Sequence, residues 1–377
     1  MIQAAEAKPS RLERFGVYYL NLFNRIDSKH NVFDLTDAEL KRRVNRISLK
    51  GILFSSLVGI ICVFPTVWVD VHFTNSSFVV HYGWVAGVTL LSVLIEFYVL
   101  FLIALKAVHE VSELINLHAT NAELGQGSLF SVTNILARAA LELPDPELKI
   151  LGIDPFKQVP KKNLFILGLL YKAKIFVTNF VLKYGLKATA GNAIGGISVL
   201  YEALPVEAFW NSVVIERVVH EARLRLFGFA LAHQIGKNVL QDHILEQLSP
   251  EARTGCLRAI GNALVMAQNY HPNMIILLLR FKDILQENEE RQYDDWNLFL
   301  DTLNKVTPKE RLFLLDLFTL SAAFDGRLSH LVKANLQSAY GEEYDVYYPR
   351  LEALTEHLKR GQLNAALALC RFDSMGE

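Results

Sequence analysis

One acidic residue, Glu96, interrupts the long apolar run at residues 82–105. An ionised carboxylate in the hydrocarbon of a membrane is costly, so such a residue is usually neutral, hydrogen-bonded, or turned toward protein or water. Glu96 could therefore handle a proton or cation, or it could be a protonated or hydrogen-bonded carboxyl that holds helices together in an oligomer. No basic residue lies at matching depth in the preceding apolar run, residues 51–69, so a salt bridge within the chain is not expected. We favour the second interpretation, because one acid without a relay is little evidence for transport.

Four further residues are candidate metal ligands: His109, Glu113, Glu216 and His220. His109 and Glu113 are one helical turn apart and share a face. The triplet Val-His-Glu occurs around both histidines. If the two helices are neighbours, facing carboxylate and imidazole groups could bind a divalent metal ion. The Glu-x-x-His spacing of such sites occurs at neither position, so hydrogen bonds and salt bridges between helices are the expected alternative.

The chain shows no catalytic or nucleotide-binding constellation. It lacks the motifs G-x-S-x-G, H-E-x-x-H and G-x-x-x-x-G-K-[ST], and its 3 cysteines match no metal spacing. The 38 basic and 39 acidic residues nearly balance, so no global positive field attracts nucleic acid. We therefore expect neither an enzyme nor a nucleic-acid-binding protein, and no cofactor beyond the metal ion considered above.

The apolar runs at residues 51–69 and 82–105 are each long enough to cross the hydrocarbon core of a membrane. We predict a transmembrane hairpin whose second helix continues as a stalk to residue 118. Residues 1–50 carry amphipathic helices, which either lie in the membrane interface or pack on a later domain. Five basic residues precede the first run, and the loop between the runs has no lysine or arginine. The positive-inside rule therefore puts both termini in the cytoplasm, at the inner or plasma membrane. The five are Lys41, Arg42, Arg43, Arg46 and Lys50.

The remaining segments also show helical patterns, so the predicted fold class is all-α. Several prolines mark residues 119–160 as a linker. Residues 161–248 are predicted to form a central helical domain, which is rich in small residues. Gly191 and Gly195 form a G-x-x-x-G step, which allows close helix packing. Lysines interrupt the apolar stretches here, so we expect a buried helical pair rather than further membrane spans. Pro205 is expected at the start of the next helix.

Residues 249–377 predict a compact helical domain, with a capping box at Thr307 and Glu310. Residues 317–331 read LFTLSAAFDGRLSHL: a small-residue helix that ends in Ala-x-Asp-Gly, followed by a serine-capped helix. This pattern resembles the TerB-like domain of tellurite-resistance and stress-response proteins. The resemblance implies an all-helical fold and a metal ion held by acidic residues near such turns, with Asp325 as the one position carried over. Without a metal, Asp325 would cap locally and the next glycine would permit a left-handed helix end.

These features predict a membrane-anchored helical protein, a sensor or scaffold in bacterial envelope stress response or defence. The expected partners are membrane lipid, a second copy of the chain and a cytoplasmic protein. The alternative is an oligomeric channel or transporter whose second spans line a path past Glu96.

Overall fold

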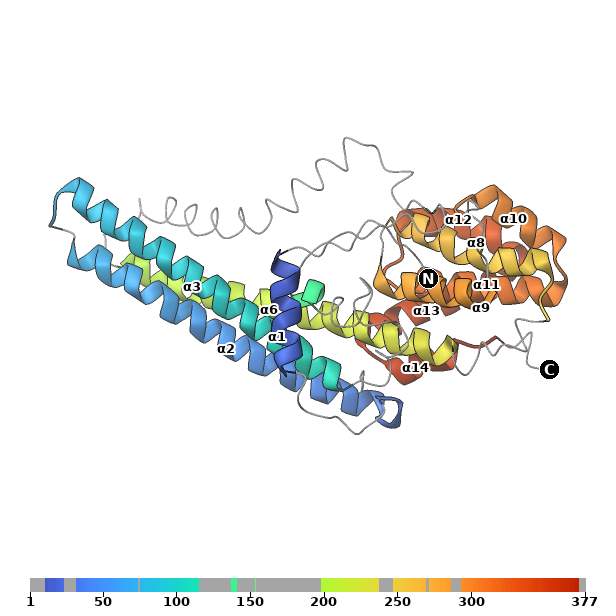
Figure 1. Cartoon of the computed structure of the whole chain (residues 1–377), viewed down its shortest axis with the longest axis horizontal. Helices are drawn as coiled ribbons and strands as arrows, with labels where there is room; N and C mark the ends of the chain where they lie inside the picture. Colours follow the sequence, from blue (N-terminus) through green and yellow to red (C-terminus); the bar gives the residue numbers. More distant parts are fainter. Residues whose placement is uncertain are drawn as a thin grey trace. The chain divides into compact units, whose positions relative to one another are not determined.

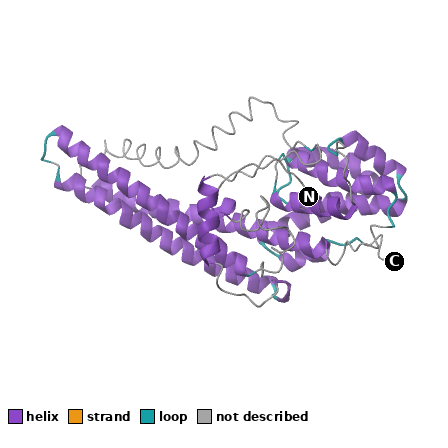
Figure 2. Cartoon of the chain, in the orientation of Figure 1, coloured by secondary structure: helices purple, strands orange, loops and turns teal. Residues whose placement is uncertain are grey.

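The computed structural model describes residues 11–23, 32–73, 75–114, 137–140, 153, 198–236, 247–268, 271–285 and 293–372. These ranges form helices and no strand, which confirms the all-α fold class (Figure 2). The helices belong to two compact units. Unit 1 comprises Met1–Val44, His109–Gln158 and Glu221–Glu377, and unit 2 comprises Asn45–Val108 and Val159–His220.

The first long helix, α2 (Asp37–His72), carries the basic segment and the first apolar run without a break. It begins with a capping box. The Glu39 N–H donates to the Thr36 hydroxyl at 3.3 Å, and the Thr36 N–H donates to the Glu39 carboxylate at 3.0 Å. Two backbone groups at the helix start are thereby satisfied. Pro65 lies inside the helix without ending it.

Helix α3 (Phe78–Glu113) carries the second apolar run and continues past it. Up to Glu113, this agrees with the predicted stalk. Helix α3 lies antiparallel to α2 in unit 2 (Figure 1). Asp70 Oδ1 and His81 Nε2 lie 3.1 Å apart near the turn. The hydroxyls of Thr66 and Thr89 lie 3.4 Å apart further along. These pairs fix the register of the hairpin.

Helix α6 (Ser198–Gln234) runs through Pro205, so the expected helix start at this residue is wrong. A proline inside a helix removes one backbone hydrogen bond and crowds the carbonyl four residues earlier. The helix can continue when neighbouring helices support it. Residues 198–220 of α6 belong to unit 2 and residues 221–234 to unit 1.

Unit 1 consists mainly of shorter helices around α11, in which most residues are buried. Large aromatic side chains, such as Phe313 and Phe318, fill the space between α11 and its neighbours. The helix of this unit nearest the N-terminus, α1, matches an amphipathic helix expected in residues 1–50, with Leu20 buried and Tyr18 exposed. The helices are α1 (Arg11–Phe23), η1 (Val32–Asp34), α8 (Pro250–Ala267), α9 (Pro272–Leu285), α10 (Trp296–Lys305), α11 (Pro308–Ala323), α12 (His330–Tyr340), η4 (Gly341–Glu343), α13 (Tyr344–Arg360) and α14 (Leu363–Leu369).

Side-chain caps start four helices of unit 1, including the two helices predicted to begin at Thr307 and Ser329. Ser249, Asp295, Thr307 and Ser329 each accept the backbone N–H of the residue three positions later. A cap from a distant part of the chain was not predicted. Asp37 accepts the N–H of Asn364 at 2.9 Å and of Ala365 at 3.1 Å, and so fastens the start of α2 to α14 within unit 1.

Several predictions concern residues outside the described ranges. They include Gly191 and Gly195, the last residues of the stalk, and the linker at residues 119–160 apart from 137–140 and 153. The boundaries predicted at residues 160 and 248 divide the chain in a different way from the two units and stay predictions.

Candidate functional site

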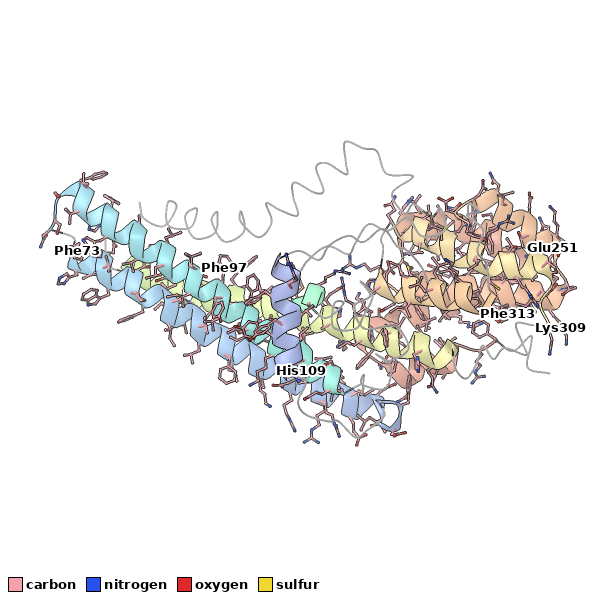
Figure 3. All side chains as sticks on the ribbon, in the orientation of Figure 1. Phe73, Phe97, His109, Glu251, Lys309 and Phe313 are labelled. Carbon is pink, nitrogen blue, oxygen red and sulfur yellow. The ribbon has the colours of Figure 1, made fainter. Side chains whose placement is uncertain are left out.

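Glu96 lies buried in unit 2, with 6% of its surface exposed. Asn211 of α6, itself 2% exposed, donates from Nδ2 to Glu96 Oε1 at 2.9 Å. The hydrogen-bonded state expected for Glu96 is therefore present, but its donor comes from the same chain. An oligomer is not needed to supply it. Phe97, the next residue on α3, marks this level in Figure 3.

Asn211 also joins α6 to α2. Its Nδ2 lies 3.3 Å from the carbonyl oxygen of Ser55, so one amide group contacts both helices of the hairpin. At the next residue of each helix, the hydroxyls of Ser56 and Ser212 lie 2.8 Å apart. The Ser212 hydroxyl donates to the Ala208 carbonyl oxygen at 2.6 Å, and Ser56 Oγ lies 3.3 Å from the same oxygen. The half-buried hydroxyls of Ser56 and Ser212 thus form a second polar contact between α2 and α6, beside Asn211.

Small residues on α2 make room for the cluster. A Cβ atom on Gly59 would lie 2.7 Å from Asn211 Nδ2 and 3.3 Å from the Glu207 carbonyl oxygen. A Cβ atom on Gly51 would lie 2.7 Å from Ile215 Cγ2. Gly51, Ser55 and Gly59 thus repeat the small-xxx-small pattern that lets membrane helices approach closely. We name Glu96, Asn211, Ser55 and Gly59 the interhelical cluster.

The interhelical cluster lies on residues that the sequence analysis did not single out, except for Glu96. Gly51, Ser55 and Gly59 are small residues spaced four positions apart in the first apolar run, the same spacing as Gly191 and Gly195. This spacing is the sequence signal for the close packing of α2. Asn211 gives no local signal, because it is a single asparagine 115 residues from its partner.

The chemistry of the interhelical cluster suits helix attachment. An amide N–H can donate to a carboxyl group whether that group is ionised or neutral. Hydrogen bonds between helices in membranes contribute about 0.6 kcal/mol on average and at most about 1.7 kcal/mol. A buried carboxyl left without its donor would cost more, about 1–3 kcal/mol.

The residues predicted as metal ligands do not form a cluster in the described part of the chain. His109 Nε2 and Glu113 Oε1 lie 3.3 Å apart on α3, in unit 1. Glu216 and His220 lie on the part of α6 that belongs to unit 2, where Glu216 is exposed. Among the described residues, no group of three or more His, Cys, Asp or Glu residues could hold a metal ion. His109 and Glu113 pair one turn apart within α3, so this contact is not one of the salt bridges expected between helices.

Asp325 lies in unit 1 just past the end of α11, where the sequence places a turn. Its Oδ1 accepts the N–H of Arg327 at 2.9 Å, and Gly326 adopts a φ of +67°. Burial raises the pKa of Asp325 to about 6. This is the local cap and left-handed helix end that need no metal.

The same turn holds the second part of α6 within unit 1. Asn273 of α9 donates from Nδ2 to the carbonyl oxygens of Leu224 and Phe324, at 3.2 Å and 3.1 Å. A Cβ atom on Gly326 would lie 3.0 Å from Leu224 Cδ1, so the glycine permits a close contact. The Asp-Gly turn therefore serves as a docking point for α6.

His271 lies directly before α9. It is buried, and its Nδ1 accepts the N–H of Asn273 at 3.4 Å. Burial, with the positive charge of Arg225 as a second cause, lowers the pKa of His271 to about 3. The ring is therefore neutral at physiological pH.

Comparison with known proteins adds no relative to this picture. No family model, no curated protein and no solved structure matches the chain. The function must therefore be argued from the arrangement of its own residues.

Proposed function

We propose that this protein is a non-enzymatic membrane-anchored scaffold or sensor that serves bacterial envelope stress response or defence. Unit 2 anchors it in the inner or plasma membrane, and unit 1 lies in the cytoplasm and contacts a protein partner. The resemblance of residues 317–331 to TerB-like domains supports the stress-response role.

The exposure of apolar side chains on α2 and α3 is the main observation in favour of the proposed membrane anchor. In each helix only 22% of the most apolar 18-residue window is buried. A core helix of a water-soluble protein would be mostly buried, as α11 is. The exposed side chains include Phe54, Leu57, Ile61, Phe64, Trp68, Leu90, Leu91, Leu94 and Ile95. Side chains stand out along both helices in Figure 3, where Phe73 marks the turn.

The charges on α2 support the proposed orientation. All five basic side chains of the segment from Lys41 to Lys50 are exposed, and the turn at residues 73–77 has no basic residue. Aromatic residues Trp68, Tyr82 and Trp84 are exposed near that turn, as in the interfacial belt of membrane proteins. By the positive-inside rule, the start of α2 and unit 1 lie on the cytoplasmic side.

Helix α6 contributes residues both to unit 2, the proposed membrane anchor, and to unit 1, which supports the proposed sensor role. Its first part is bonded to the hairpin through Asn211, and its second part is bonded to the α9 and α11 region through Leu224. Helix α6 therefore has hydrogen-bond partners within each of the two units.

Cysteine labelling of the full chain in cells tests the anchor. We expect Ser76→Cys in the turn to react with a membrane-impermeant thiol reagent in intact cells. Lys359→Cys in unit 1 should react only after the membrane is opened. Carbonate extraction should leave the protein in the membrane pellet. Release by carbonate, or equal labelling of both variants in intact cells, would contradict the proposal. Affinity purification from detergent that recovers no specific partner would count against the scaffold role.

A channel or transporter that uses Glu96 is the second candidate. A buried carboxyl within a membrane-length helix is the observation that favours it. The amide partner at Asn211 gives the carboxyl a structural role, which makes this candidate the weaker one. Proton or cation flux into vesicles that falls on Glu96→Gln would support transport, whereas unchanged or absent flux would remove it.

A further inference from the structure

Helix α6 was expected to belong to a domain outside the lipid, but its contacts within unit 2 place it beside the hairpin (Figure 1). Three contacts give its register against α2. Ile215 lies against Gly51, and Ser212 against Ser56. Glu207 lies against Gly59. As the α2 number rises, the α6 number falls, so the two helices are antiparallel.

This register puts part of α6 at the depth of the first apolar run. The three contacts on α2 lie within residues 51–59, which belong to that run. From Asn211 back to Ser198 the helix extends 13 further residues (211 minus 198), or about 20 Å at 1.5 Å per residue. Because α6 is antiparallel to α2, this extension points toward the end of α2 near His72.

The side chains of this part of α6 are arranged as they would be in lipid. Among the residues of known exposure from Leu204 to Val214, the exposed side chains are those of Pro205 and Phe209, both apolar and one turn apart. Phe209 is 68% exposed. The polar side chains of Glu207 and Asn211 are buried instead.

The exposed charges of α6 begin where the register leaves the apolar run. Glu216 and Arg217 are both exposed and directly follow Ile215, the residue against Gly51. Gly51 is also the first residue of the apolar run of α2, directly after Lys50. The change from apolar to charged surface therefore occurs at the same level on both helices.

We propose that residues 198–214 of α6 form a third membrane-embedded helix, with Phe209 in contact with lipid acyl chains. The occupant is lipid because the exposed face of Phe209 continues the exposed apolar surface of α2 at the same level. Leu57 of α2, which is 52% exposed, lies between Ser56 and Gly59 in the register and so matches the level of Phe209. The proposal rests on the membrane anchor proposed above and extends it to α6.

Spin labels on the full chain in phosphatidylethanolamine and phosphatidylglycerol vesicles test this proposal. Single variants Phe209→Cys, Leu57→Cys and Glu216→Cys carry the label, and the chain without an added cysteine gives the background. The background should be low, because all three natural cysteines are buried and burial raises the pKa of Cys256 and Cys370. Collision of the label with oxygen reports lipid, and collision with a water-soluble nickel complex reports water.

We expect the label at Phe209→Cys to match Leu57→Cys, with an oxygen-to-nickel collision ratio several-fold above that of Glu216→Cys. Strong collision with nickel at Phe209→Cys would overturn the proposal, because the helix would then lie in water. Weak collision with both reagents would also overturn it, because a second protein surface would then cover Phe209. If Leu57→Cys itself collides mainly with nickel, the membrane anchor fails as well. If only Phe209→Cys does so, the anchor stands and this inference alone is wrong.

Discussion

Replacement of Gly59 by alanine should separate the effect of close helix packing from the general effect of adding a methyl group. The new Cβ would lie 2.7 Å from Asn211 Nδ2, so the amide must move away. It would then lose its bonds to Glu96 and to the carbonyl of Ser55. Gly87→Ala is the matched control, because Gly87 is also a glycine in an apolar helix and nothing lies within 4 Å of its added Cβ.

The expected magnitude follows from three contributions. Both alanines gain helix propensity of up to about 1 kcal/mol, which cancels when the two variants are compared. Gly59→Ala also loses two hydrogen bonds between helices, at about 0.6 kcal/mol each on average. Crowding against the Glu207 carbonyl, 3.3 Å from the new Cβ, adds to this cost, since overpacking is worth about 1–3 kcal/mol. We therefore expect Gly59→Ala to be roughly 2–4 kcal/mol less stable than Gly87→Ala.

The free energy of unfolding can be measured on the full chain in mixed micelles, with circular dichroism during titration by a denaturing detergent. The same substitution in an Asn211→Ala background gives a second control. There the amide is already absent, so the cost of Gly59→Ala should shrink. Equal stability of Gly59→Ala and Gly87→Ala would refute the close approach of α6 to α2.

Three further predictions concern the interhelical cluster and the turn of unit 1. In a double-mutant cycle, Glu96→Gln and Asn211→Leu should show a coupling energy of about 0.6–1.7 kcal/mol, and strict additivity would refute their contact. Asp325 has a pKa raised above its ordinary value of 3.8, to about 6, so the folded state holds the proton more tightly. The contribution of Asp325 to stability is greatest below about pH 4 and falls as the pH rises toward 6. At pH 7 the Asp325→Asn variant should therefore unfold at a higher temperature than the natural chain. At pH 4 this difference in unfolding temperature should disappear. Gly326→Ala should cost about 1–2 kcal/mol in unfolding free energy, because its φ of +67° is left-handed, and an unchanged value would contradict that strain.

Glu96 illustrates which structural features a sequence pattern can predict and which it cannot. A carboxyl among apolar residues is expected to be neutral, hydrogen-bonded or turned toward protein or water. In the structure Glu96 accepts a hydrogen bond from Asn211. The identity of the partner was not predictable, because Asn211 lies 115 residues away in a segment that reads as an ordinary charged helix. An oligomer was invoked because no local partner was visible.

The predictions from local chemistry agree with the described structure more often. The caps at Thr307 and Ser329 and the turn at Asp325 involve residues three or fewer positions apart. Such contacts depend on helix geometry alone. The expected helix start at Pro205 failed, because packing of α6 on its neighbours can sustain a helix that local propensity would interrupt.

The sequence by itself determined that the described part of the chain is helical, where two membrane-length apolar helices lie, and where helices such as α11 and α12 begin. These properties follow from side-chain type and spacing over a few turns. Only the tertiary structure decided that α6 packs on the hairpin, that Asn211 satisfies Glu96 and that Asp37 caps α14. Each of these contacts joins residues more than a hundred positions apart, and the close approach of whole helices at glycines such as Gly59 decides which distant polar groups meet.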